Sequence, residues 1–184
     1  MSKHTCLYYD SDKSLLELIV PYFEQGFRNN EMCIWIVPQS LGVEAARSYL
    51  FKEIKDMHKY TSKGQMEFFT AEDFYTHEGK FDVDRVINVW SGKERQALKL
   101  GFSGVCASGD ASWVPGGDWE SLTKYEKVVN DKIAQSHITA LCTYPSEKYD
   151  MSKLFALSFF HGTTIREKDG KLDVLMSRDS SHFK

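Results

Sequence analysis

The sequence predicts an α/β fold in which a mostly parallel central sheet is covered by helices on both faces. Along the 184 residues, short apolar runs alternate with longer segments whose apolar residues recur at three- and four-residue spacing. Strands that alternate with helices pair in parallel through helical crossovers, which are right-handed in nearly every case. The length suits one domain of roughly 100–200 residues. We therefore expect a single domain over residues 1–184, with its core over residues 4–160.

Five segments are expected to form the parallel part of the sheet. Each is a short, mostly apolar run that is bounded by polar residues, glycine or proline: 4–9, 32–37, 66–69, 102–107 and 138–144. The run 32–37 shows no polar alternation, which indicates a strand that is covered on both faces.

Five helices are expected between and after these strands, over residues 14–26, 43–54, 82–101, 118–135 and 151–160. The pair Ser14 and Glu17 fits a capping box at the start of the first helix. Ser11 or Asp12 could cap this helix equally well. Pro21 removes a backbone hydrogen bond and predicts a kink or a late start. Residues 70–80 are expected to form a surface loop.

The C-terminal segment predicts a β-hairpin over residues 163–175. Asp169 and Gly170 separate two apolar runs there, and this dipeptide tolerates the positive φ angles of a tight hairpin turn. Residues 177–184 form a polar tail.

Charge and hydropathy exclude two classes of partner. Lys and Arg number 23, Asp and Glu number 26, and no basic block interrupts this balance, so we expect no direct binding of nucleic acid. No apolar run approaches the roughly 18 residues that a membrane span needs. The N-terminus lacks the apolar segment of a secretory signal. We therefore expect no membrane association and a cytoplasmic location.

The cysteines are widely spaced and form no Cys-x-x-Cys pair, so buried free thiols are their simplest role. A metal cluster is the less favoured alternative. His4 and Cys6 would share one face of the first strand, and Cys106 and Cys142 lie on strands that could flank it. Together these four side chains could bind zinc or another soft metal. We favour buried thiols and expect no metal or other cofactor.

A ligand crevice is expected beyond the carboxyl ends of the parallel strands. Asp110 ends an apolar strand, as in the magnesium-binding strand of nucleotide hydrolases, although an aspartate there can equally cap a loop. Glu126 and Asn130 share a helix face because they are four residues apart. The candidate ligand-binding residues are Tyr9, Trp35 and Trp113 as apolar walls, and Asp110, Glu126 and Asn130 as polar groups.

Lys13 and Ser14 stand where the Lys-Ser pair of a phosphate-binding loop would open a helix. Leu7 and Asp12 occupy the positions that this motif gives to glycine, and the Asp12 carboxylate would repel phosphate. A helix cap with a solvent-facing lysine is therefore favoured. A nucleotide-binding or ATPase-like domain with an atypical phosphate site stays an alternative.

Several short motifs, taken together in order, resemble one known family. They are His4-x-Cys6-x-x-Tyr9, Tyr22-Phe23-x-x-Gly26, Glu31-x-x-x-Trp35-Ile36, Glu72-x-x-Tyr75, Gly79-x-Phe81-Asp82, Gly101-Phe102, Gly109-Asp110-x-x-Trp113, Tyr125-Glu126-x-x-x-Asn130 and Leu141-Cys142-x-Tyr144. This series is similar to the MEDS domain, the methanogen/methylotroph DcmR-like sensory domain.

The resemblance implies a RecA-like three-layer sandwich, related to the circadian-clock ATPases but without a working phosphate loop. It also implies a sensory role with small one-carbon or hydrocarbon-derived ligands. Family members often carry this domain beside a histidine kinase or a DNA-binding helix-turn-helix. The resemblance strengthens the candidate roles of seven residues and supplies no catalytic residue. Four of them are possible pocket residues, Asp110, Trp113, Glu126 and Asn130, and the others are His4, Cys6 and Tyr9.

We therefore expect a non-catalytic, cytoplasmic sensory domain that binds a small, mostly apolar molecule, with closure of loop 111–117 as its signal. The output would pass to a separate histidine kinase or transcription regulator. A second alternative is an interaction module, whose sheet edge or hairpin pairs with such a regulator or with a second copy in a homodimer.

Overall fold

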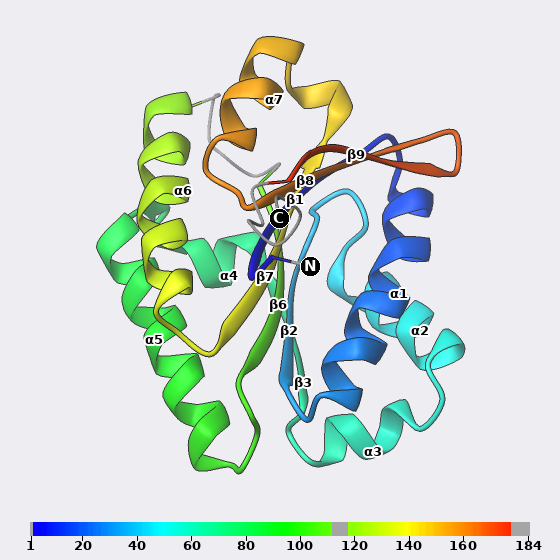
Figure 1. Ribbon diagram of the computed structural model, residues 1–184. Helices are drawn as coiled ribbons and strands as arrows, with labels where there is room; N and C mark the ends of the chain where they lie inside the picture. Colours follow the sequence, from blue (N-terminus) through cyan, green and yellow to red (C-terminus); the bar gives the residue numbers. More distant parts are fainter. Residues whose placement is uncertain (1, 112–117, 178–184) are drawn as a thin grey trace, which may run out of the picture.

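A seven-stranded sheet lies between two layers of helices (Figure 1). The computed structural model describes residues 2–111 and 118–177. In spatial order the strands are β3 (Met66–Thr70), β2 (Met32–Val37), β6 (Val105–Asp110), β7 (Ile138–Pro145), β1 (His4–Tyr9), β8 (Thr163–Lys168) and β9 (Lys171–Ser177). All neighbours pair in parallel except β8 and β9, which form an antiparallel hairpin. The predicted mostly parallel α/β sheet with a C-terminal hairpin is confirmed.

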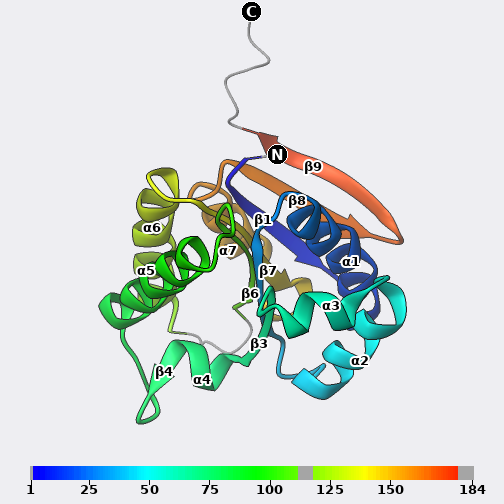
Figure 2. The same ribbon diagram turned by 90° about the horizontal axis from the view of Figure 1, so that it is seen from below.

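The helices divide between the two faces of the sheet (Figure 2). One face packs against α1 (Asp12–Arg28), α2 (Val43–Glu53) and α3 (Met57–Ser62). The other face packs against α4 (Ala71–Tyr75), α5 (Val83–Lys99), α6 (Trp119–Ala134) and α7 (Met151–Ser158). Every residue of β2 is buried, as its uninterrupted apolar run predicts for a strand covered on both faces.

Helix α1 begins earlier than Ser14. The Ser11 side chain accepts a hydrogen bond from the Ser14 backbone N–H, and the Ser14 hydroxyl accepts one from the Ser11 backbone N–H. This reciprocal cap places the first helical residue at Asp12. The helix continues through Pro21 to Arg28, because its buried face on the sheet outweighs one missing backbone hydrogen bond.

The segment 70–80 is not a loop, which corrects the expectation from its mixed composition. Thr70 caps α4, and the hairpin strands β4 (Thr76–His77) and β5 (Lys80–Phe81) follow. Glu78 and Gly79 adopt positive φ angles in the turn between these strands. Helix α3 and the short 3₁₀ helix η2 (Ser146–Lys148) were also not expected. All of these elements are too short to show a hydrophobic period.

The C-terminal hairpin turns at Asp169 and Gly170, which both have positive φ angles, as the sequence predicts. Within the described part of the chain, no helix combines the length and the hydropathy that crossing a bilayer requires.

Candidate functional site

Four metal-ligand side chains meet on the sheet face that α6 and α7 cover. One ligand atom from each lies within 4.8 Å of the others. We call this group the buried cluster; its members are His4, Glu126, Cys142 and His161. The two histidines and the glutamate are at most 4% exposed, and Cys142 is partly buried. The cluster therefore sits inside the molecule, away from bulk water.

Three elements and one helix end bring the buried cluster together. His4 opens β1, and Cys142 lies on the neighbouring strand β7, opposite Cys6. Side chains alternate along each strand, so His4 and Cys142 project from the same face of the sheet. Glu126 comes from α6, and His161 follows the end of α7. The cluster thus depends on the pairing of β1 with β7 and on the docking of both helices.

Distances within the buried cluster are short. The Nε2 atom of His4 lies 3.3 Å from the Cys142 Sγ and 3.6 Å from the Glu126 Oε2. The Nε2 atom of His161 lies 3.4 Å from the same carboxylate oxygen. The two imidazole rings are also adjacent, with centroids 4.1 Å apart.

The other ring nitrogens face hydrogen-bond acceptors. The Nδ1 atom of His4 donates to the Phe160 carbonyl at 3.1 Å and lies 3.3 Å from the Asn130 Oδ1. The Nδ1 atom of His161 donates to the Leu157 carbonyl at 2.8 Å. A carbonyl oxygen can only accept, so each Nδ1 carries the hydrogen. Each neutral ring then presents the Nε2 lone pair to the centre of the cluster.

Burial controls protonation in the buried cluster. Desolvation lowers the pKa of His4 to about 4 and lowers the pKa of His161 well below its usual value. Desolvation raises the pKa of Glu126 to about 7 and raises the pKa of the Cys142 thiol well above its usual value. Each group on its own therefore favours the neutral form.

A small apolar cavity adjoins the buried cluster, between α5, α6 and the sheet. Its volume is about 20 Å³, taken as the space open to the centre of a water-sized sphere. A single water needs roughly 10–15 Å³ on this measure, so the cavity holds one very small molecule. Cys142, a member of the buried cluster, is part of its wall. We call it the α5–α6 cavity; its lining is Tyr75, Ile87, Trp90, Ala107, Gly109, Tyr125, Val129, Lys132, Ile133, Ile138, Ala140 and Cys142.

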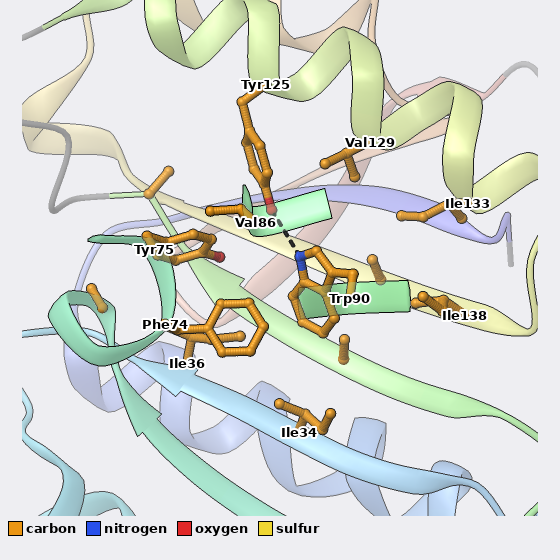
Figure 3. Close-up of a cluster of buried hydrophobic side chains, with 14 of the residues drawn as sticks. Ile34, Ile36, Phe74, Tyr75, Val86, Trp90, Tyr125, Val129, Ile133 and Ile138 are labelled. Carbon is orange, nitrogen blue, oxygen red and sulfur yellow. Dashed lines mark hydrogen bonds between the residues drawn. The ribbon is translucent and has the colours of Figure 1, made fainter. Parts of the chain in front are cut away.

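Three aromatic side chains from three helices, Tyr75, Trp90 and Tyr125, belong to the wall of the α5–α6 cavity and lie close together (Figure 3). The indole Nε1 of Trp90 donates to the Tyr125 hydroxyl at 3.1 Å. The rings of Tyr75 and Tyr125 pack edge to face, with their centroids 5.8 Å apart. Tyr75 packs against Gly109 on β6, where a Cβ atom would collide with the Tyr75 hydroxyl. Glycine at this position therefore allows α4 to close on the sheet.

The structure brings some of the residues predicted for the crevice into contact. Glu126 and Asn130 both face His4, so the expectation from their i, i+4 spacing that they share a helix face holds. At the carboxyl end of β1, the Tyr9 hydroxyl donates to the Asp110 Oδ2 at 2.9 Å, and both side chains are buried. These two pairs occupy different faces of the sheet.

Other candidates lie elsewhere. Trp35 is fully buried between Phe23 and Phe68 in the core under α1, and not in a crevice wall. A cleft of about 310 Å³ does border the carboxyl ends of β2 and β3. Tyr9, Trp35 and Asp110 are not among the described residues that line it. Trp113 and most of loop 111–117 lie outside the described residues.

The proposed phosphate residues lie apart from the buried cluster, and two of the proposed thiol ligands are not members of it. Lys13 is exposed and pairs with Glu17 at 3.9 Å, while Ser14 serves the helix cap. Cys6 shares the face of His4 but is not one of the four converging ligands. Cys106 points to the opposite face, under α1, because the alternation of β6 turns it away from α6.

His161 is the member of the buried cluster that the sequence did not single out. It lies just beyond the end of α7, and no histidine or cysteine stands near it at a metal-ligand spacing. It meets the other members of the cluster only in the folded protein. No local signal identifies it. Only the docking of α7 beside β1 brings it to the cluster.

Comparisons with known proteins agree with this architecture. Residues 3–162 match the model of one family, MEDS, which is described as the MEthanogen/methylotroph, DcmR Sensory domain. Among solved structures, a KaiC-like protein from the hyperthermophilic archaeon Pyrococcus horikoshii OT3 is similar, with a TM-score of 0.62 and 10% sequence identity. The match covers 96% of this chain and 80% of that chain. At this identity the likeness shows the fold alone, which is RecA-like. No curated protein matches the chain.

Proposed function

This chain belongs to the MEDS family, and from that premise we propose that it senses one small, mostly apolar molecule in the α5–α6 cavity. The description of the family as a sensory domain supports a signalling role. The cavity is the observation that carries the rest of the proposal, because its walls are mainly aliphatic and aromatic and its volume is about 20 Å³. A one-carbon compound is of this size.

The size of the cavity limits the affinity. The best small ligands gain at most about 1.5 kcal/mol for each non-hydrogen atom. A molecule with two such atoms would then gain about 3 kcal/mol, which corresponds to a Kd of roughly 6 mM. A sensor of this kind would respond to a metabolite that is present at millimolar concentration.

Contacts between the aromatic side chains in the cavity wall support a way for ligand binding to change the arrangement of the helices. Tyr75, Trp90 and Tyr125 come from α4, α5 and α6; Trp90 donates a hydrogen bond to Tyr125, and the Tyr125 ring packs edge to face on Tyr75. A molecule that binds better to one arrangement of these helices than to another shifts the population toward it. A separate histidine kinase or transcription regulator is the proposed receiver of this change.

The nucleotide alternative has less support. The Glu167 carboxylate accepts hydrogen bonds from the backbone N–H groups of Asp10 and Gly170, at 3.4 and 2.9 Å. An anionic group thus already contacts an amide of the turn between β1 and α1. A phosphate at this turn would meet like charge, which is unfavourable.

Methyl NMR of isoleucine side chains tests the proposed function. Methanol, which has two non-hydrogen atoms, serves as the probe, and the Ile133 and Ile138 methyl signals report on the cavity that they line. We expect saturable shifts of these signals at millimolar probe. The Ile54 signal should not move, because Ile54 packs under α1 and α2 on the other face.

Two substitutions of alanine by valine, one in the cavity wall and one on the surface, test the site and provide its control. Ala140→Val would fill the cavity that Ala140 lines, and should abolish the saturable shifts. Ala134→Val makes the same change at an exposed position of α6, and the saturable shifts should persist in this variant. Equal shifts at Ile54, or unchanged binding in Ala140→Val, would contradict the proposed site.

A further inference from the structure

Three of the six separations between ligand atoms in the buried cluster match those of a four-coordinate metal site. Zinc lies about 2.0–2.1 Å from histidine nitrogen and about 2.3 Å from cysteine sulfur, so tetrahedral ligand atoms are roughly 3.3–3.6 Å apart. The three measured separations, His4 to Cys142, His4 to Glu126 and His161 to Glu126, are 3.3, 3.6 and 3.4 Å. All four ligand atoms lie within 4.8 Å of one another.

Both imidazoles are oriented as metal ligands are. The Nδ1–H groups of His4 and His161 donate to the backbone carbonyls of Phe160 and Leu157. Metal-binding histidines nearly always donate their second N–H in this way, since the bond selects the tautomer and holds the ring in place. The Nε2 lone pairs are then left to face the centre of the cluster.

Two buried polar atoms in the cluster lack a partner. Neither the Glu126 Oε2 nor the His161 Nε2 has a hydrogen-bond partner among the residues that the structure describes. They face each other at 3.4 Å, and two acceptors meet there whenever the Glu126 carboxyl is ionised. Burial of a polar atom without a partner is unfavourable, because the atom loses its hydrogen bonds to water. A cation between these atoms would satisfy both.

The charges and the ligand types favour a particular class of ion. A thiolate and a carboxylate carry two negative charges, two neutral imidazoles carry none, and a divalent ion therefore leaves the buried site neutral. Imidazole and thiolate select zinc-like transition metals over calcium or magnesium. We propose that His4, Glu126, Cys142 and His161 bind one divalent transition-metal ion, with zinc the best match to this ligand set.

Such an ion would be enclosed by the protein. Four side chains fill the four tetrahedral positions, as in structural zinc sites. The ion would join β1 and β7 to α6 and to the end of α7. The proposal does not rest on the sensory role, because it depends on the four ligand atoms and not on the α5–α6 cavity.

Metal loading of the full chain under reducing conditions tests the proposal. The protein is freed of metal, loaded with Co²⁺ or Zn²⁺ alone, dialysed and assayed for metal content. We expect one ion for each chain. With Co²⁺ we expect the visible bands of a tetrahedral complex and a sulfur-to-cobalt charge-transfer band. Absence of stoichiometric metal would overturn the proposal. A proton shared by Glu126 and His161 would then explain the short distance between the Glu126 Oε2 and the His161 Nε2.

Variants distinguish this site from adventitious binding. Cys142→Ser should remove the charge-transfer band, and His161→Gln should weaken the metal affinity at least 100-fold. Cys106→Ser and His137→Gln are the matched controls, because Cys106 lies on the other face and His137 is exposed. Both control variants should bind one metal ion for each chain with the affinity of the wild type. Retention of the band in Cys142→Ser would contradict the assignment.

Circular dichroism of each metal-free variant shows whether it folds. If Cys142→Ser does not fold, X-ray absorption of the cobalt-loaded wild type decides the question. One sulfur neighbour at about 2.3 Å among nitrogen and oxygen neighbours supports the proposed ligand set. A shell without sulfur would refute it.

Discussion

At the scale of single residues, Gly109 illustrates how closely the elements around the α5–α6 cavity approach. A Cβ atom at this position would collide with the Tyr75 hydroxyl, and the Ile36 side chain lies 3.9 Å from the same point. The requirement is one of space, since Gly109 is not among the described glycines with positive φ. Any side chain would therefore displace α4.

We predict that Gly109→Ala lowers the free energy of unfolding by about 1–3 kcal/mol, because overpacking forces neighbouring groups to move. Urea denaturation measures the change. The double variant Gly109→Ala/Tyr75→Phe should recover part of the loss, since Tyr75→Phe removes the hydroxyl that the new methyl group meets.

Gly92 in α5 is the matched control for this prediction. A Cβ atom there meets nothing nearer than 4.0 Å, where the Arg95 guanidinium lies. Alanine within a helix is more stable than glycine by roughly 0.5–1 kcal/mol. Gly92→Ala should therefore raise the free energy of unfolding. A similar loss in both variants would show that the contact between Gly109 and Tyr75 is not the cause.

At the scale of elements, α6 serves both of the candidate sites. Glu126 and Asn130 face His4 in the buried cluster, whereas Tyr125, Val129 and Ile133 line the α5–α6 cavity. A displacement of this helix would therefore alter the cavity and the cluster together.

We predict that Tyr125→Phe destabilises the protein by about 1–3 kcal/mol. The substitution removes the hydroxyl that accepts the Trp90 indole N–H, and a buried donor without a partner bears its full desolvation cost. The intrinsic fluorescence of Trp90 should change as well, because its polar neighbour is lost. Thermal and urea unfolding measure the loss of stability.

Tyr60→Phe is the control for this substitution. Tyr60 stacks on Phe27 with ring centroids 4.0 Å apart, and its hydroxyl makes no hydrogen bond within the described residues. We expect Tyr60→Phe to change the free energy of unfolding by less than about 0.5 kcal/mol. An equally small effect of Tyr125→Phe would mean that water replaces the hydroxyl at Trp90.

At the scale of the whole molecule, the sheet ends in an exposed edge strand. Strand β9 pairs only with β8 among the described strands, and three of its apolar side chains are more than half exposed: Leu172, Val174 and Leu175. Unprotected edges of this kind readily pair with other chains. The homodimer that the sequence analysis gave as an alternative can therefore be tested at β9.

We predict that Val174→Lys leaves the free energy of unfolding within about 0.5 kcal/mol of the wild type, because Val174 is 65% exposed. If the chain forms a dimer through β9, this charge should weaken the association in sedimentation experiments over a range of concentrations. Phe155→Lys on α7, which is 61% exposed, is the control for a general loss of surface hydrophobicity. Equal association of Val174→Lys and the wild type would exclude β9.

Much of the architecture could be predicted because it depends on local patterns. Strands β1, β2 and β7 and the turn at Asp169 and Gly170 follow from apolar runs and from turn chemistry. The short elements between β3 and α5 could not be predicted, because one or two turns of helix show no period. They form because Phe74 and Tyr75 are buried against the rest of the core.

The candidate sites could be predicted only in part. The spacing of Glu126 and Asn130 placed them on one helix face, and strand alternation placed His4 with Cys6. The sequence does not contain the register of β6, so it could not show that Cys106 faces away from His4. His161 carries no signal in its own neighbourhood.

The sequence by itself determined the alternation of strands and helices, the hairpin and the resemblance to a sensory family, because each of these depends on residues near one another in the chain. The tertiary structure alone decided which side chains meet. Contacts between His4, Glu126, Cys142 and His161 arise from strand order and from helix docking. Strand order and helix docking depend on packing throughout the core, which brings residues far apart in the sequence into contact.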